Sequence, residues 1–162
     1  MTAEMEINVL FDEGLKDCLK AYWLKNLAEQ VLVSERADPG VEMGLVIASQ
    51  GKVRQLNKAY LERDEPTDVL AFSMLEEENA ARHQPFVTAP DGIAHLGEVI
   101  ISYPQAVKQA GEHRHSVKRE VATLIIHGVL HLLGYDHDTP EPKRLMSTRE
   151  AAILNLTKEE LD

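Results

Sequence analysis

The sequence predicts an α/β fold of the α+β type, with one domain in which a small mixed four-stranded sheet packs against helices. The chain has 162 residues, a length that suits one domain with one sizeable core. Hydrophobic residues make up 44% of it, an ordinary share for a globular protein. Short apolar runs alternate with longer segments of helical period, in the order β-α-β-α-β-β-α-α-α. We therefore expect residues 1–162 to form a single domain.

Hydrophobic period and turn residues define the individual elements. Strands are expected at residues 6–10, 44–48, 69–74 and 97–102, where apolar side chains alternate with polar ones or form short runs. Helices are expected at residues 15–31, 52–61, 104–112, 116–133 and 143–156, where apolar side chains recur at helical spacing. Ser116 is the expected N-cap of the fourth of these helices, and Gly134 is expected to stop it. Residues 76–95 are polar and irregular, with Pro85 and Pro90, and predict a long mobile loop that can cover a site.

The charge balance does not by itself indicate a nucleic-acid-binding protein. The net charge is −10 and aromatic residues amount to 5%, so any RNA interaction has to depend on local charge. Basic side chains gather in two groups, Lys52, Arg54, Lys58 and Arg63 in one, and Arg114, Lys118 and Arg119 with His113 and His115 in the other. A basic groove for RNA and ordinary solvated helix faces both explain these groups.

The sequence favours a cytoplasmic protein without membrane association. Cys18 is the single cysteine, so no intrachain disulfide can form, and a lone thiol fits a reducing compartment. The first six residues carry acidic side chains where a signal peptide needs basic ones. The longest apolar run, residues 121–133, is too short to span a membrane and contains two histidines.

Three histidines predict a metal site on the helix at 116–133 and the turn that follows it. His127 and His131 are four residues apart, so both imidazoles lie on one face of a helix. Glycine readily adopts the left-handed backbone conformation, so Gly134 lets the chain turn back and bring His137 to the same ion. The alternative is a pair of helix histidines satisfied by hydrogen bonds, but imidazoles without partners in so apolar a helix would be costly.

Three neutral imidazoles leave a tetrahedral metal one open position, which is the arrangement of a catalytic site. We expect one zinc ion, although nickel, copper or cobalt also suit imidazole ligands. The spacing of the histidines and Gly134 matches that of metzincin proteases, which place a glutamate directly after the first histidine as the general base. Here that position is Gly128, so we do not expect peptide hydrolysis.

The stretch from Ser116 to His137, which ends in HGVLHLLGYDH, closely resembles the YbeY family of metal-dependent endoribonucleases, which take part in maturation of bacterial ribosomal RNA. The resemblance extends over about residues 45–154. Leu56-Asn57, Tyr60 and DEPTDVLAF at residues 64–72 are similar to a second family motif, and LGEVIIS at residues 96–102 to a third. Met146 and Glu150 fit the C-terminal helix of the family.

This resemblance implies an endoribonuclease that cleaves single-stranded RNA in ribosomal RNA maturation and ribosome quality control, with a ribosomal subunit or ribosomal proteins as further partners. The family has a functionally important arginine after the Tyr60 position, where this chain has Leu61, and Arg63 is the nearby substitute. Arg63 is our candidate for stabilising charge on the phosphate, and Asp136, Asp68 and Glu98 are candidate bases. Asp136 can instead orient an imidazole. Two alternatives remain: a metal-dependent hydrolase of another substrate, and a non-catalytic ribosome-assembly factor with a structural metal.

Overall fold

The structure is a computed structural model. It describes residues 5–12, 14–16, 18–37, 39–61, 67–74, 94–135 and 140–157. At residues 61, 94 and 140–142 this description covers the backbone only.

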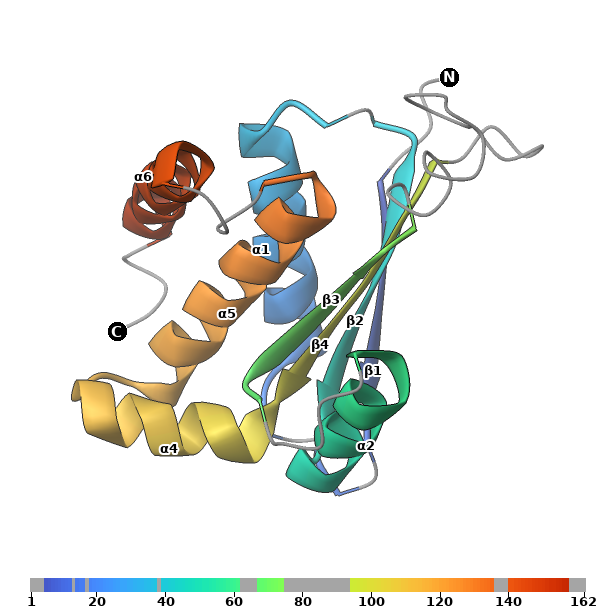
Figure 1. The fold of residues 1–162 in the computed structure, drawn as a ribbon, viewed down its shortest axis with the longest axis vertical. Helices are drawn as coiled ribbons and strands as arrows, with labels where there is room; N and C mark the ends of the chain where they lie inside the picture. Colours follow the sequence, from blue (N-terminus) through green and yellow to red (C-terminus); the bar gives the residue numbers. More distant parts are fainter. Residues whose placement is uncertain are drawn as a thin grey trace.

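A four-stranded mixed sheet forms the middle of the molecule (Figure 1). Its strands are β1 (Glu6–Phe11), β2 (Val41–Ala48), β3 (Val69–Ser73) and β4 (Ala94–Ser102). Their order across the sheet is β1-β2-β4-β3, with β1, β2 and β4 parallel to one another and β3 antiparallel to β4. The sheet confirms the expected fold class.

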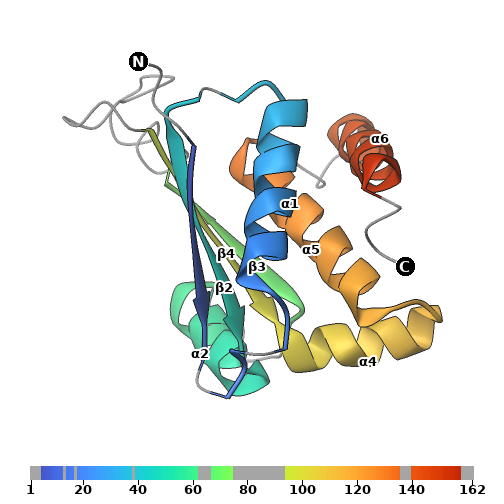
Figure 2. The same ribbon diagram turned by 180° about the vertical axis from the view of Figure 1, so that it is seen from behind.

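Helices cover both faces of this sheet. They are α1 (Ala21–Ser34), α2 (Gln50–Leu61), α4 (Tyr103–His113), α5 (Val117–Leu132) and α6 (Pro140–Leu156). Figures 1 and 2 show α1 and α5 on one face of the sheet and α2 on the other. α6 packs on the outer side of α5, so α5 lies between the sheet and α6. None of the helices in the described part of the chain combines the length and apolar character needed to cross a membrane.

The strands bury apolar side chains on both faces because side chains alternate along a strand. The larger core lies under α1 and α5, and its strand residues include Met43, Leu45, Ile47, Val99 and Ile101. A smaller cluster on the α2 side contains Ala48, Val53, Leu70 and Ile100. The larger core therefore fixes α5, which carries the expected metal-binding histidines, against the sheet.

The first helix begins later than its apolar spacing predicts. It starts at Ala21, whereas Leu15, Cys18 and Leu19 lie in the turns before it. These three side chains are half-buried against the core, so their spacing reflects burial rather than helix. Leu15 N–H donates to the carbonyl of Asp12 at 3.0 Å and Cys18 N–H to that of Leu15 at 3.2 Å, which holds the segment in turns.

Two strands begin three residues earlier than expected. β2 begins at Val41 and β4 at Ala94, so the last two residues of the expected loop at 76–95 belong to a strand. There His95 Nδ1 contacts the carboxylate of Glu42, its neighbour on β2. Residues 76–93 lie outside the described residues, and the loop stays a prediction there.

Candidate metal centre

α5 has the start and the end that its sequence predicts. The hydroxyl oxygen of Ser116 accepts the N–H of Arg119 at 3.1 Å, which confirms the N-cap. Gly134 has φ 103° and donates to the carbonyl of His131 at 3.0 Å, while Tyr135 N–H donates to that of Leu130 at 3.1 Å. This pair of bonds is a Schellman motif, which a glycine in the left-handed region allows. The chain therefore turns away from α5 at Gly134, three residues after His131, as the expected site requires.

His127 and His131 project from α5 one helical turn apart, and both are half-buried. Nδ1 of His127 lies 2.7 Å from Oε1 of Glu150 on α6. The hydrogen bond to Glu150 raises the pKa of His127 against the opposing effect of burial. With the proton on Nδ1 directed at the carboxylate, Nε2 is the nitrogen with a lone pair for a metal ion. A carboxylate behind a histidine is the usual second partner of a metal-binding imidazole, so this contact fits a metal site.

Gly128 lets α5 approach the sheet closely. A Cβ at this position would lie 2.6 Å from Cγ1 of Val99 on β4, a distance that requires atoms to move. A glutamate in the protease position would therefore collide with the sheet. The structure gives a packing reason for the glycine that separates this chain from the metzincin pattern.

Of the candidate catalytic residues within the described ranges, Asp68 lies near His127 and Glu98 does not. Asp68 is half-buried just before β3, and its charge contributes to the raised pKa of His127, so it belongs to the surroundings of that imidazole. Glu98 is exposed on β4 and pairs in register with Phe72, which packs in the cluster on the α2 side. It therefore lies on the sheet face opposite α5, away from the histidines.

His137, Asp136 and Arg63 lie outside the described residues, and their predicted roles, like those of His127 and His131 as metal ligands, stay predictions. The side chain of Leu61, the last residue of α2, is outside them as well.

A brace between α1 and α6 holds the chain where it leaves α5. Tyr135 OH donates to Oε2 of Glu35 at 2.8 Å, and Arg149 Nε donates to Oε1 of the same carboxylate at 2.6 Å. Glu35 is the C-cap residue of α1 and Arg149 belongs to α6. The brace fixes Tyr135, two residues before the predicted ligand His137.

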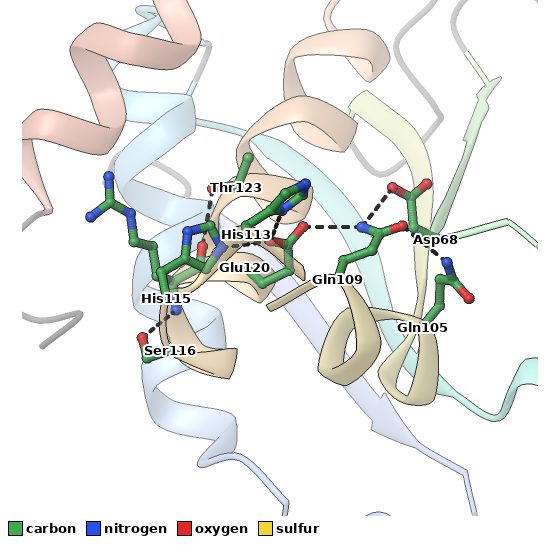
Figure 3. Close-up of polar contacts among 9 residues, drawn as sticks. Asp68, Gln105, Gln109, His113, His115, Ser116, Glu120 and Thr123 are labelled. Atoms are coloured by element: carbon green, nitrogen blue, oxygen red, sulfur yellow. Dashed lines mark hydrogen bonds and ion pairs between the residues drawn. The ribbon is translucent and has the colours of Figure 1, made fainter. Parts of the chain in front are cut away.

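Sequence reasoning missed a buried polar network beside α5 (Figure 3). Glu120, which is 3% exposed, binds His113, His115 and the amide of Gln109. Nε2 of Gln109 also donates to Oδ2 of Asp68 at 3.2 Å. The sequence places His113 and His115 among the basic residues before α5, but in the structure a buried acid partners them. The available signal was Glu120 itself, an acid in the first turn of a strongly apolar helix.

The role of Glu150 was also missed. The residue fits the family's C-terminal helix, and Met146 one turn earlier is 2% exposed, so this face of α6 packs inward. A half-buried histidine on α5 needs a partner, and a carboxylate on the inward face of the next helix was the available signal.

Comparisons with known proteins agree on one family. The model of the family described as "Endoribonuclease YbeY" matches residues 13–158. A protein of that name from Dehalococcoides mccartyi is 48% identical over 160 residues, covering 98% of this chain and 100% of the relative. A protein of the same name from Moorella thermoacetica is 42% identical over 135 residues, which cover 81% of this chain and 85% of the relative. A solution structure from Thermotoga maritima has the same fold, with a TM-score of 0.63 at 24% identity over 95% of this chain and 90% of that chain.

Proposed function

Because this chain belongs to the endoribonuclease YbeY family, we propose that it is a metal-dependent hydrolase that cuts RNA at internal phosphodiester bonds. The observation that carries the metal dependence is the placement of His127 on α5, with Nδ1 held by Glu150 and His131 one turn further on. RNA as the substrate is supported by the relatives' name and by the family match over residues 13–158.

The donor set suits a transition metal. His127, His131 and His137 would hold one ion through imidazole nitrogens, for which zinc is our first choice and nickel, copper or cobalt are the alternatives. When bound, such an ion acidifies a water molecule and polarises a phosphoryl oxygen. Glu150 keeps the His127 ring in the tautomer that exposes Nε2, and it fixes the orientation of the ring.

Proton transfer and charge stabilisation would come from neighbouring side chains. Asp68 is the candidate base that the structure supports best, because its charge acts on His127 and Gln109 holds one of its oxygens. Asp136 is proposed either as a base or as the partner of an imidazole. Glu98 is the weakest candidate because it lies on the far face of the sheet. Arg63 is proposed to stabilise negative charge on the phosphate oxygens.

Exposed basic side chains near α2 and after α4 support an RNA backbone as ligand. They are Lys52, Arg54 and Lys58 on α2 and Arg114 after α4, and Lys52 also forms an ion pair with Asp12 at 3.1 Å. We propose single-stranded ribosomal RNA as the substrate, with a ribosomal subunit or ribosomal proteins as partners, in the cytoplasm. The resemblance of the motifs supports the substrate, and the single Cys18 supports the compartment.

The first test measures RNA cleavage and metal content on the same preparation of the full chain, with His127→Ala alongside. Cleavage that follows metal occupancy and disappears in His127→Ala supports the nuclease. Stoichiometric metal with no cleavage of ribosomal RNA favours a hydrolase of another substrate. His95→Ala is the matched control, because it removes an imidazole that contacts a carboxylate near the start of β2 and β4, on a different element from the histidines of α5.

Chelation separates the enzyme from an assembly factor with a structural metal. Loss of cleavage with the circular dichroism spectrum unchanged supports a catalytic ion, whereas unfolding on chelation supports a structural one. His131→Ala is expected to lower metal content sharply while most secondary structure is retained. Full metal occupancy in this variant would exclude the three-histidine site.

A further inference from the structure

Two histidines and one glutamate converge at the junction between α4 and α5 (Figure 3). Nδ1 of His113 lies 2.8 Å and Nε2 of His115 lies 2.6 Å from the same oxygen, Oε1 of Glu120. Within the described ranges, these three side chains form a group whose donor atoms all lie within 4.8 Å of one another. Two imidazoles and one carboxylate are a donor set found in three-ligand zinc sites.

The backbone at this junction directs both imidazoles to one point. α4 ends at His113, and Arg114 adopts the left-handed conformation, with φ 58° and ψ 42°. The N–H of His115 then returns to the carbonyl of Ala110 at 3.1 Å, and that of Arg114 to the carbonyl of Gly111 at 3.3 Å. A left-handed backbone is unfavourable for a residue other than glycine, so these capping bonds maintain the reversal.

The carboxylate of Glu120 is buried, and a hydrogen bond from Gln109 orients it. Its side chain is 4% exposed, so the charge has to be satisfied by the groups around it. Oε2 accepts a hydrogen bond from Nε2 of Gln109 at 3.0 Å, which leaves Oε1 directed at the two imidazoles. Outer hydrogen bonds orient metal-binding carboxylates in this way. The His113 side chain is 55% exposed, so the cluster has one side open to solvent.

Shared protons hold the three groups together in the metal-free protein. The hydrogen bond to Glu120, and then its charge, raise the pKa of His113. Burial would raise the pKa of Glu120, but hydrogen bonds from His113, His115 and Gln109 outweigh it and lower that pKa. A divalent cation can displace these protons and satisfy the same three atoms. Ligands at 2.0–2.1 Å from one ion lie about 3.3 Å apart, so the nitrogen-to-oxygen separations need to open by about 0.6 Å.

We propose that His113, His115 and Glu120 form a second site for a divalent transition metal such as Zn²⁺, separate from the histidines of α5. Glu120 and His127 are seven residues apart on one helix, about 10 Å along its axis, so one ion cannot serve both. The bound ion links the end of α4 to the first turn of α5. It also acts on the surroundings of His127, because Gln109 joins Glu120 to Asp68.

Metal stoichiometry of the full chain tests this site. The protein is stripped with a chelator, dialysed against Zn²⁺ and then against zinc-free buffer, and its zinc is measured by elemental analysis. Two ions per chain are expected for the wild type, one for His131→Ala, one for the double variant His113→Ala with His115→Ala, and none for the triple variant. His95→Ala, the matched control, removes an imidazole that contacts a single carboxylate, that of Glu42, and should keep two ions.

Thermal unfolding gives a second readout. Zn²⁺ is expected to raise the Tm of His131→Ala, and to leave unchanged the Tm of the variant that also lacks His113 and His115. If the double variant does not fold, His113→Asn replaces it, because this exposed ring can be changed without opening the core.

The proposal is overturned if the double variant, or His113→Asn in its place, binds as many ions as the wild type, or if folded His131→Ala binds none. If His131→Ala binds as many ions as the wild type and the double variant binds one fewer, the second site stands and the α5 site falls. Because the readouts are bound zinc and Tm, failure here is distinguishable from failure of the proposed RNA cleavage.

Discussion

Replacing Gly128 with alanine is expected to destabilise the protein, although alanine is the better helix former. A Cβ there would lie 2.6 Å from Cγ1 of Val99, about 0.8 Å short of the 3.4 Å at which ordinary contact begins. Val99 cannot rotate away, because its Cγ2 would lie 3.1 Å and its Cβ 3.4 Å from the new atom, and the residue is fully buried. α5 therefore has to move away from β4.

A comparison with a second helical glycine separates the cost of the steric clash from the gain in helix propensity. Overpacking of this kind costs about 1–3 kcal/mol, against a gain of about 1 kcal/mol from replacing a helical glycine. Gly111 on α4 offers the same gain, and a Cβ there would meet nothing within 4 Å. The difference between Gly128→Ala and Gly111→Ala should therefore be about 1–3 kcal/mol, or about 2–12 °C in Tm for a chain of this size.

Thermal and urea unfolding of both variants in the presence of chelator measure this difference. Zinc binding by Gly128→Ala should also weaken, because a shift of about 0.8 Å exceeds the roughly 0.5 Å within which a functional site must be held. If Gly128→Ala unfolds at or above the Tm of Gly111→Ala, the close packing of α5 on β4 is not what requires the glycine, and the reasoning is refuted.

Glu150→Ala is expected to weaken zinc binding about 10–100-fold, because a ligand imidazole loses its outer hydrogen bond. Glu150→Gln keeps an acceptor oxygen and should lose less zinc affinity than Glu150→Ala. Competition with a chromophoric chelator measures the zinc affinity of both variants and of the wild type. Equal affinities in all three proteins would contradict the role of Glu150 in orienting His127. Tyr135→Phe removes the donor to Glu35 and should lower the free energy of unfolding, measured in urea, by about 0.5–1.5 kcal/mol. An unchanged urea midpoint would show that this hydrogen bond contributes nothing to stability. The bond to Glu120 raises the pKa of His113 above its ordinary 6.5, so its stabilising contribution is present below that pH and is lost as the pH rises through the raised value. Metal-free wild type should therefore exceed His113→Ala in stability most below pH 6.5, and this advantage should shrink as the pH rises through the raised pKa; an advantage that does not change with pH would argue against the pairing.

α5 was predictable because local residues encode its boundaries. Ser116 caps the first turn through its own hydroxyl, and Gly134 supplies the left-handed backbone that ends the helix. The start of α1 was not predictable in this way. The apolar residues at 15, 18 and 19 repeat with helical spacing, but the hydrogen bonds that hold them in turns do not show in a hydrophobic pattern.

The candidate site likewise has a part that the sequence predicts and a part that depends on how the helices pack. The spacing of His127 and His131 is a property of one helix, so it can be read directly from the sequence. The partner of His127 lies 23 residues away on α6, and the packing of α6 on α5 decides which side chains meet. The contacts of Glu120 likewise depend on how α4 turns into α5, which includes a left-handed arginine that no turn rule favours.

Ten of the 16 residues of α5 are buried between the sheet and the outer helix, so its central amides should be among the last to exchange with deuterated solvent. Such amides open only when the whole domain unfolds, and their exchange rate reports global stability. The two imidazoles on this helix therefore keep their mutual spacing with or without an ion. Chelation is expected to leave exchange in the middle of α5 slow, and reloading should then be limited by the arrival of the ion rather than by refolding.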